Sequence, residues 1–228
     1  MNRKAVRVVL SLWGLHNVPS LVHATLNYWL FFGRHIDSIG KARARIHPSA
    51  RLLVQNSRIV VDDGVLSVGY FPDWFPALGC KDICEIRLRN STLRAIGNVD
   101  LRPGVTIWAV NANVVIGNGT VINGPAEITS RVGVKIGSHC SIAKDTVIMD
   151  CDHHKHALAG EKPEDVAKEV IIGDHCWIGH NVTILKGVKV GEGSIIAAMS
   201  LVTKDVEARS MVGGVPARKI KENIIWEQ

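Results

Sequence analysis

One short stretch of the chain concentrates the side chains that can move protons. It holds two carboxylates and three imidazoles, namely Asp150, Asp152, His153, His154 and His156. A histidine, with an ordinary pKa near ~6.5, can take a proton from an attacking hydroxyl at neutral pH and return it later. A neighbouring carboxylate can orient the imidazole. The stretch therefore indicates general-base catalysis, and the alternative interpretation is a histidine-rich loop that is merely solvated.

A metal site is the second chemistry that these residue types allow, because Asp and His at close spacing can bind zinc. Three further histidines, His139, His175 and His180, lie at corners of the sequence repeat described below, without the pattern of a ligand set. Cys80 and Cys84 lack the second pair that a zinc knuckle requires. We therefore expect no metal.

A repeat with a period of six residues surrounds the cluster and must position it. The aliphatic series that follows the cluster is Ile172, Ile178, Ile184, Val190, Ile196 and Val202. Neither a helix of 3.6 residues per turn nor an alternating strand has this period. A chain that turns a corner after each short strand does, and three such strands close a coil of roughly 18 residues. The repeat therefore predicts a parallel β-helix, rather than an ordinary sheet with scattered glycines.

The repeat upstream of the cluster shows where the solenoid is interrupted. It reaches Ile128, slips by two residues and resumes at Ile136, which predicts a bulged corner. It stops in residues 150–169, which are polar and are typical of an extruded loop. Because Ile148 and Ile172 are four steps of six apart, this loop should leave the solenoid and re-enter it in phase.

The sequence predicts three segments. Residues 1–40 form an N-terminal helical segment, residues 41–208 form the β-helix with its extruded loop at 150–169, and residues 209–228 form a C-terminal tail. No linker separates a second domain.

The N-terminal segment has no Lys, Arg, Asp or Glu between Val8 and Gly33. Polar side chains and Pro19 make a spanning helix costly there. We expect two short amphipathic helices broken near this proline. Residues 5–32 would then either lie on a membrane surface or pack on the solenoid or a neighbouring subunit, and the sequence leaves both open.

Composition limits the class of partner. The formal net charge is +6, which suits an anionic ligand or an anionic membrane surface. Nucleic acid is less favoured, because no dense Lys/Arg block alternates with aromatic residues. The five cysteines are scattered, so we expect no disulfide framework and a reducing compartment. Cys140 and Cys176 each lie two residues before an aliphatic repeat position and should be small inward-facing residues.

The repeat also resembles a known family. The segment "IIGDHCWIGHNVTILKGVKVGEGSIIAAMSLVTKDV", followed by "VGGVPARKI", is similar to the C-terminal half of hexapeptide-repeat acyltransferases. The subgroup it resembles is the sugar and polysaccharide O-acetyltransferases related to galactoside and maltose acetyltransferases. The resemblance extends from about Val114 to Ile220. It implies an all-β fold, a left-handed parallel β-helix of hexapeptide repeats, and a homotrimer.

The resemblance assigns roles to three polar positions. Counting back from Trp177, the family's catalytic histidine falls on His153, with His154 as the neighbouring alternative and as a sugar contact. Asn123 matches the asparagine that binds the sugar acceptor, although a corner asparagine with left-handed backbone is an equal alternative. Asp150 or Asp152 would orient the imidazole. Because His153 and Asn123 are not a whole number of coils apart, they should lie on different faces, which favours sites between subunits of a trimer.

The resemblance further implies that acetyl-CoA binds along the C-terminal coils. Its pantetheine arm would pass the backbone near Gly179 and Ala198, and Trp177 would wall the thioester pocket. Thr203 and Lys204 match the positions near the phosphates, and Arg218 matches the basic residue beside the 3′-phosphate.

The predicted function is transfer of an acetyl group from acetyl-CoA to a hydroxyl of a sugar, in a surface polysaccharide or its precursor. We expect a cytoplasmic protein with peripheral contact to the cytoplasmic face of the membrane. Two alternatives are an N-acetyltransferase for a nucleotide-linked amino sugar and a non-enzymatic β-helix scaffold. The loop with His153 and the "TK" and "PAR" segments argue against the scaffold.

Overall fold

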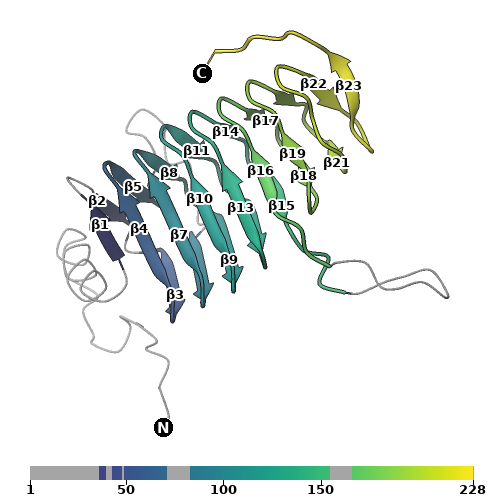
Figure 1. Ribbon diagram of the computed structural model, residues 1–228. Coiled ribbons are helices and arrows are strands. Elements are labelled where there is room, and N and C mark those ends of the chain that lie inside the picture. The colour runs from purple at the N-terminus through teal and green to yellow at the C-terminus, as the bar shows by residue number, and fades with distance from the viewer. Residues whose placement is uncertain (1–35, 40–42, 48, 71–82, 155–165, 228) are drawn as a thin grey trace.

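The computed structural model describes residues 36–39, 43–47, 49–70, 83–154 and 166–227 (Figure 1). Within these residues the chain forms strands only, arranged as three sheets, with no helix. The expected N-terminal helices at 5–32 lie outside the described residues. No helix in the described part of the chain is long and apolar enough to cross a membrane.

Each sheet takes one strand from every coil. The first sheet contains β1 (Ile36–Ile39), β4 (Arg58–Asp62), β7 (Thr92–Ile96), β10 (Asn113–Ile116), β13 (Gly133–Ile136), β16 (Val170–Ile172) and β19 (Lys189–Val190). The second contains β2 (Arg43–Ile46), β5 (Val65–Val68), β8 (Val99–Leu101), β11 (Thr120–Ile122), β14 (Ser141–Ile142), β17 (Trp177–Ile178), β20 (Ile195–Ile196), β22 (Met211–Gly213) and β23 (Arg218–Lys221). The third contains β3 (Arg51–Gln55), β6 (Glu85–Arg89), β9 (Val105–Val110), β12 (Ala126–Ser130), β15 (Val147–Met149), β18 (Thr183–Ile184) and β21 (Leu201–Val202).

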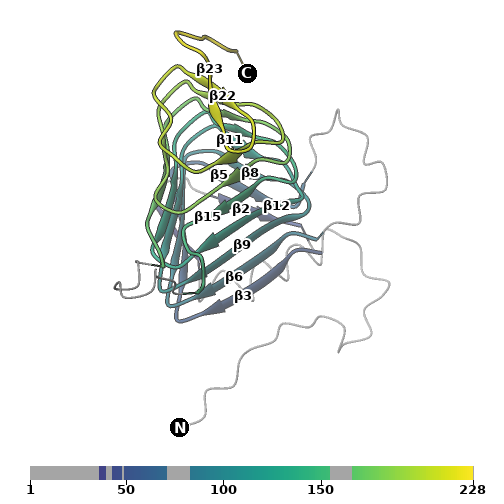
Figure 2. The same ribbon diagram turned by 90° about the vertical axis from the view of Figure 1, so that its right-hand side faces the viewer.

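The period of six has the predicted structural cause. Ile172 pairs with Val190, and Ile178 with Ile196, in parallel register between successive coils. The repeat positions are buried in one continuous core, which also contains Cys140 and Cys176. Stacking identical positions places one aliphatic row above another along the axis. Figure 2 shows the stacked strands β3, β6, β9, β12 and β15 of the third sheet. The predicted left-handed parallel β-helix is thus confirmed.

The corners between sheets are tight enough to select small residues. A Cβ added to Gly179 would lie 2.6 Å from the backbone nitrogen of Ala198 on the next coil. No real Cβ approaches backbone this closely, so a larger residue would push the two coils apart. This explains why small residues follow the aliphatic positions in the repeat.

The sheets extend beyond residues 41–208 in both directions. At the N-terminal end β1 pairs with β4, so the first sheet already includes residues 36–39. At the other end β22 continues the second sheet in parallel, and β23 then turns back antiparallel to β22. The tail after β23 folds back along the solenoid, where Trp226 stacks on His175 with ring centroids 4.3 Å apart.

Candidate functional site

Two corners of the solenoid carry the residues singled out from the sequence. We call the first the loop corner; it follows β15, β18 and β21, and register places Asp150, Lys186 and Lys204 at equivalent positions on it. We call the second the Asn123 corner; it follows β11, β14, β17 and β20. The two corners lie at opposite ends of the strands of the third sheet. His153 and Asn123 therefore lie on different edges of the molecule.

His153 lies at the loop corner, where the chain leaves the solenoid after β15. Its backbone has a φ of 65°, in the left-handed region that non-glycine residues seldom occupy. Its backbone N–H donates to the Sγ atom of Cys151 at 3.2 Å. Its ring is stacked beside that of Trp108 on β9, with centroids 6.4 Å apart and 24° between the planes. Both His153 and His154 are exposed, so either imidazole is open to a substrate.

Asp150 has a structural role that the sequence did not reveal. The residue is fully buried. One carboxylate oxygen accepts from the Ser130 hydroxyl at 2.7 Å and from the backbone N–H groups of Val132 at 2.9 Å and Gly133 at 2.7 Å. The other accepts from the Arg131 N–H at 2.7 Å. These four donors match the roughly four lone-pair sites of a carboxylate.

This network corrects the expected role of Asp150 as the group that orients the imidazole. Its carboxylate instead closes the corner between β12 and β13, where the sequence repeat slips by two residues. The extra length of that corner presents three successive backbone N–H groups to one anion. Since the loop begins directly after this anchored residue, Asp150 fixes the backbone from which His153 projects.

Asp152 also has a partner other than the imidazole. Its carboxylate lies 2.6 Å from the Nζ atom of Lys186 on the next coil, and this lysine side chain is only 15% exposed. Its backbone N–H donates to the carbonyl of Val166 at 2.8 Å, on the returning side of the loop. Within the described residues the His153 ring has Trp108 as its neighbour and no carboxylate partner. Asp152 therefore holds the base of the loop together.

Asn123 begins the Asn123 corner and is half-buried in a polar network. Its Oδ1 accepts from the Nη1 atom of Arg102 at 2.6 Å, and its Nδ2 donates to the carbonyl of Ile142 at 3.0 Å. Arg102 also contacts Asp100 at 3.3 Å. Burial raises the pKa of Asp100, partly offset by Arg102. The amide keeps one lone pair and one hydrogen unused, so it can still bind a sugar hydroxyl.

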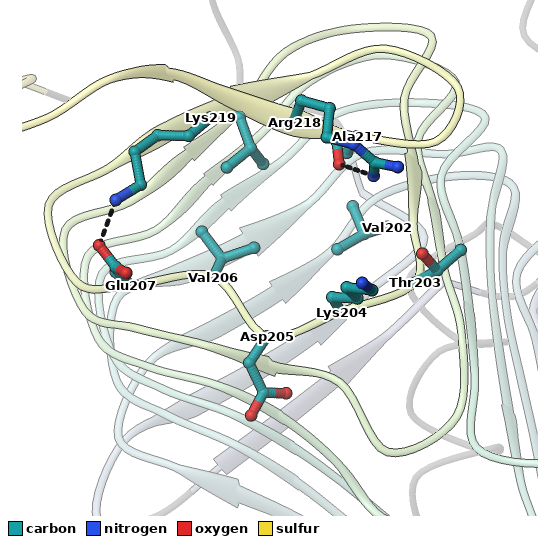
Figure 3. A pocket seen from close by; sticks show the side chains of 10 residues that line it. Val202, Thr203, Lys204, Asp205, Val206, Glu207, Ala217, Arg218 and Lys219 are labelled. Carbon is teal, nitrogen blue, oxygen red and sulfur yellow. Dashed lines mark hydrogen bonds and ion pairs between the residues drawn. The ribbon is translucent and has the colours of Figure 1, made fainter.

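Three of the expected donor-binding residues meet in one pocket. Thr203, Lys204 and Arg218 line a cavity of about 250 Å³ between residues 202–207 and β23 (Figure 3). Lys219 lies on its wall and contacts Glu207 at 2.5 Å. This pairing raises the pKa of Lys219. The cavity thus gathers three cationic side chains, Lys204, Arg218 and Lys219, and two carboxylates, Asp205 and Glu207, at the C-terminal end of the solenoid. Because Glu207 pairs with Lys219, Lys204 and Arg218 are the cations that suit an anionic ligand.

The other expected donor residues lie elsewhere. Gly179 and Ala198 are in contact at the Asn123 corner. Trp177, on β17, is 45% exposed and packs against Trp226 of the C-terminal tail, with ring centroids 6.0 Å apart. Thr203 and Lys204 therefore lie at the loop corner and Gly179 and Ala198 at the Asn123 corner. Arg218 pairs with Gly213 at the end of β22 and reaches Thr203 and Lys204 across the pocket.

The pocket and the loop share an edge of the molecule. Thr203 and Lys204 follow β21, which lies two strands along the third sheet from β15. Adjacent strands are about 4.8 Å apart, so the loop and the pocket are separated by about 10 Å along the axis. A long ligand seated in the pocket can therefore extend along the loop corner towards His153.

Sequence reasoning missed Trp108, Arg131 and Trp226. The alternation in "VTIWAV" places Trp108 between the buried Ile107 and Ala109 and therefore facing outward; this signal was available in the sequence. The guanidinium of Arg131 lies 5.9 Å from the centre of the Trp108 ring. Arg131 and Trp108 lie on different coils, so no local sequence pattern indicates that they are close. Trp226 contacts His175 across the fold, which again no local pattern indicates.

Metal ligation finds no support in the described part of the chain, where no group of three or more His, Cys, Asp or Glu residues is arranged to hold an ion. His175 and His180, considered above as ligands, have other partners. The Nε2 atom of His175 lies 2.9 Å from the Trp226 carbonyl, and the Nδ1 atom of His180 lies 3.2 Å from Asp145.

Comparison with known proteins agrees with this architecture. Residues 169–204 match the family described as bacterial transferase hexapeptide (six repeats). The chain is 32% identical over 143 residues to galactoside O-acetyltransferase of Escherichia coli (strain K12), covering 60% of this chain and 70% of the relative. It is 34% identical over 125 residues to polysialic acid O-acetyltransferase of Escherichia coli O1:K1 / APEC, covering 54% of this chain and 41% of that relative.

Among solved structures, the polySia-specific acetyltransferase NeuO superposes with a TM-score of 0.59 at 28% identity, covering 85% of this chain and 83% of that one. The aligned part of this chain thus spans less than half of the polysialic acid enzyme in sequence, although the folds match over most of both chains. The repeat, the fold and these relatives together show that the chain belongs to the hexapeptide-repeat acyltransferase family and is similar to its sugar O-acetyltransferases.

Proposed function

We propose that this protein transfers an acetyl group from acetyl-CoA to a hydroxyl of a sugar, in a surface polysaccharide or its precursor. One observation carries the proposal. The exposed His153 lies on the same edge of the molecule as Thr203 and Lys204 of the pocket, about 10 Å away along the axis. A ligand whose anionic end binds in the pocket can therefore reach the imidazole with its other end. The relatives, which are named as O-acetyltransferases of galactosides and polysialic acid, support the reaction class.

In the proposed reaction, His153 acts as the general base. The imidazole takes the proton from the sugar hydroxyl while the hydroxyl oxygen forms a bond to the thioester carbonyl carbon. The carbon–sulfur bond then breaks, and the sulfur of CoA leaves with the proton that the imidazolium returns. Backbone N–H groups steady the negative charge on the carbonyl oxygen. Asp150 and Asp152 act as positioning residues, through the backbone and the base of the loop.

The donor would bind with its phosphates in the pocket. Thr203 and Lys204 would contact the diphosphate, and Arg218 the 3′-phosphate, because ammonium and guanidinium groups form strong charge-assisted hydrogen bonds with phosphate oxygens. The pantetheine arm would pass Gly179 and Ala198, with Trp177 beside the thioester. Their position at the Asn123 corner requires that this corner belong to a neighbouring copy of the chain.

The same division applies to the sugar acceptor. Asn123, and His154 beside the base, would bind its hydroxyls, yet Asn123 and His153 lie on different edges of one subunit. Packing of copies around a three-fold axis brings the loop corner of one subunit against the Asn123 corner of the next. The proposed active unit is therefore a homotrimer with sites between subunits. We place this unit at the cytoplasmic face of the membrane.

The test is a screen for the free thiol of CoA. Full-length protein is incubated with acetyl-CoA and mono-, oligo- and nucleotide-linked sugars, and the acetylated product is identified by mass spectrometry. We expect thiol release that depends on a sugar hydroxyl and yields an O-acetyl ester stable at neutral pH. Products acetylated only on amino groups would support the N-acetyltransferase alternative. No sugar-dependent release with any sugar class would contradict the proposed activity.

A further inference from the structure

The outer face of the third sheet has an aromatic and a cationic side chain directly beside the proposed base. Trp108 projects from β9 and is 41% exposed, although it also contacts the ring of His153. A large aromatic surface that stays open to water next to a reactive group is typical of a binding platform, because burying it on a ligand releases ordered water.

Arg131 completes this cluster. Its guanidinium lies 5.9 Å from the centre of the Trp108 ring, so Arg131 and His153 both lie within 6.4 Å of one ring. In the described ranges, no carboxylate lies within ion-pair distance of Arg131. By contrast, Arg87, opposite Trp108 on β6, is paired with Glu85. Arg131 therefore presents a positive charge beside the base that the described protein residues leave uncompensated.

We propose that Trp108 and Arg131 form a subsite beside His153 that binds a sugar unit carrying a carboxylate. The apolar face of the sugar ring would pack on the Trp108 indole, and the guanidinium would pair with the carboxylate, for which its planar fork of donors is suited. Deepening the proposed function, this assigns the acceptor to acidic rather than neutral glycans and names two residues that select it.

The framework around the cluster holds it in place. The backbone N–H of Arg131 donates to the buried Asp150 carboxylate, and the chain from Asp150 leads directly to His153. The β9 strand is paired on both sides, with β6 and β12. Trp108, Arg131 and His153 are therefore fixed relative to one another by paired strands and one buried anion, as selective recognition requires.

The experiment measures binding separately from catalysis. Oligosaccharides of uronic and ulosonic acids are each compared with the same compound after reduction of its carboxylates to alcohols. Dissociation constants are measured by ligand-observed NMR without acetyl-CoA, on the full-length wild-type protein and on Arg131→Gln, Trp108→Ala and Arg209→Gln. Arg209 is the matched control because it is also an exposed arginine. Its backbone N–H donates to the carbonyl of Glu192, which places it at a third corner, away from the loop corner and the Asn123 corner.

We expect wild-type protein to prefer the acidic member of at least one pair by about tenfold to a hundredfold, as a charged hydrogen bond provides. Arg131→Gln should abolish this preference, and Arg209→Gln should retain it. Trp108→Ala should weaken binding of both members about fivefold to tenfold. Equal binding of both members in every pair, or a preference that survives Arg131→Gln, would overturn the subsite.

Kinetics with the same pairs separate this inference from the proposed function. A subsite residue changes KM for the sugar, whereas a residue that only positions the imidazole changes kcat equally for all sugars. A drop in kcat alone in Trp108→Ala would therefore overturn its role in binding. Acidic glycans that bind through Arg131 but are never acetylated would leave the subsite standing and remove the proposed function. Equal acetylation of neutral and acidic glycans would support the proposed function and overturn the subsite.

Discussion

The solenoid has a wide half and a tight half, and they differ in what they can present to a ligand. In the wide half the equivalent residues Ile107 and Ile128 lie 21 positions apart, and strands such as β9 contain six residues. In the tight half Ile172 and Val190 lie 18 positions apart, and β19 contains two residues. The additional residues of a wide coil widen its outer faces, so that Trp108 can project there.

We infer that the two halves bind different substrates. The tight half has regular corners of small residues and ends in the pocket lined by Lys204 and Arg218, which suits the anionic end of the proposed donor. The wide half carries Trp108, Arg131 and Asn123, which suits a variable sugar. His153 and its loop lie where the two halves meet. Separate perturbation of each half should therefore change either donor or sugar parameters, but not both.

The largest effect is expected at the junction itself. We predict that His153→Ala lowers kcat by about 10²–10⁴-fold, the usual contribution of a general base, while acetyl-CoA binding changes by less than a few fold. Steady-state kinetics and calorimetric titration with CoA measure the two quantities. His154→Ala is the comparison and should raise KM for the sugar while retaining most of kcat, because His154 is assigned to sugar binding. If His154→Ala is inactive and His153→Ala is not, the base is the adjacent residue.

Loss of the buried Asp150 carboxylate, which lies where the two halves meet, should destabilise the fold. Asp150→Asn replaces one accepting oxygen by an NH₂ donor, which would face either the Arg131 N–H or the Ser130 hydroxyl and the N–H groups of Val132 and Gly133. We expect a loss of about 3 kcal/mol in the free energy of unfolding, because buried donors then lack partners. Urea unfolding followed by circular dichroism measures it.

Asp152→Asn is the comparison for that experiment. It removes a partly exposed ion pair with Lys186 and should cost about 1 kcal/mol or less. A loss for Asp150→Asn of about 1 kcal/mol or less, no larger than that expected of a partly exposed ion pair, would show that the Asp150 network does not stabilise the corner.

The wide half should also respond to alkaline pH through Cys84. This thiol is buried and donates to the Arg102 carbonyl at 2.9 Å. Burial raises its pKa from 9.0 to about 11. Because the unfolded thiol ionises first, its contribution to stability is complete below pH 9 and is lost as the pH rises towards about 11.

The expected slope is about 1.4 kcal/mol for each pH unit between these values. Cys84→Ser keeps a donor for the Arg102 carbonyl but does not ionise, so its unfolding free energy should lack this component. Unfolding curves from pH 8 to about 11 for both proteins provide the measurement. Parallel pH profiles would contradict the assignment.

A smaller effect is expected in the tight half. Arg218→Gln should raise KM for acetyl-CoA about tenfold, as loss of one charge-assisted hydrogen bond does, and leave KM for the sugar unchanged. The 3′-dephosphorylated form of acetyl-CoA should be insensitive to the substitution, because its partner group is missing. A rise in KM for the sugar as well would show that donor and sugar sites are not separated between the halves.

The smallest effect concerns the N-terminal segment. We predict that residues 5–32 bind anionic vesicles, with about 1 kcal/mol for each basic residue near the surface. Co-sedimentation of the full chain should weaken as salt rises but persist, because apolar insertion is not screened. A chain that starts near Lys41 is the comparison. Equal, negligible binding by both, with a less stable truncated form, would mean that this segment packs against protein.

The sequence predicted the architecture and the interruption by a loop because both follow from one period. An aliphatic residue every six positions has a single arrangement that buries all of them, and Ile148 and Ile172 remain in phase across the loop. Thr203, Lys204 and Arg218 line one pocket, and their role in binding the donor stays a prediction.

The role of Asp150 could not be predicted in the same way. The sequence around an aspartate beside histidines is the same whether its carboxylate faces an imidazole or accepts from backbone N–H groups of a turn in the previous coil. The contact of Arg131 with Trp108 likewise depends on which coils lie next to each other. Such contacts between coils have no local pattern, so they appear only once the register is known.

The final strand has a consequence for assembly. A parallel solenoid ends in open strand edges that can template the next coil, whether that coil belongs to the same chain or to another molecule. Here β23 runs antiparallel to β22, so the last strand reverses the direction that a further coil would have to follow. Its exposed Arg218 and Lys221 also place like charges along that rim. The segment that supplies cations to the pocket thereby caps the solenoid and opposes end-to-end growth into fibres.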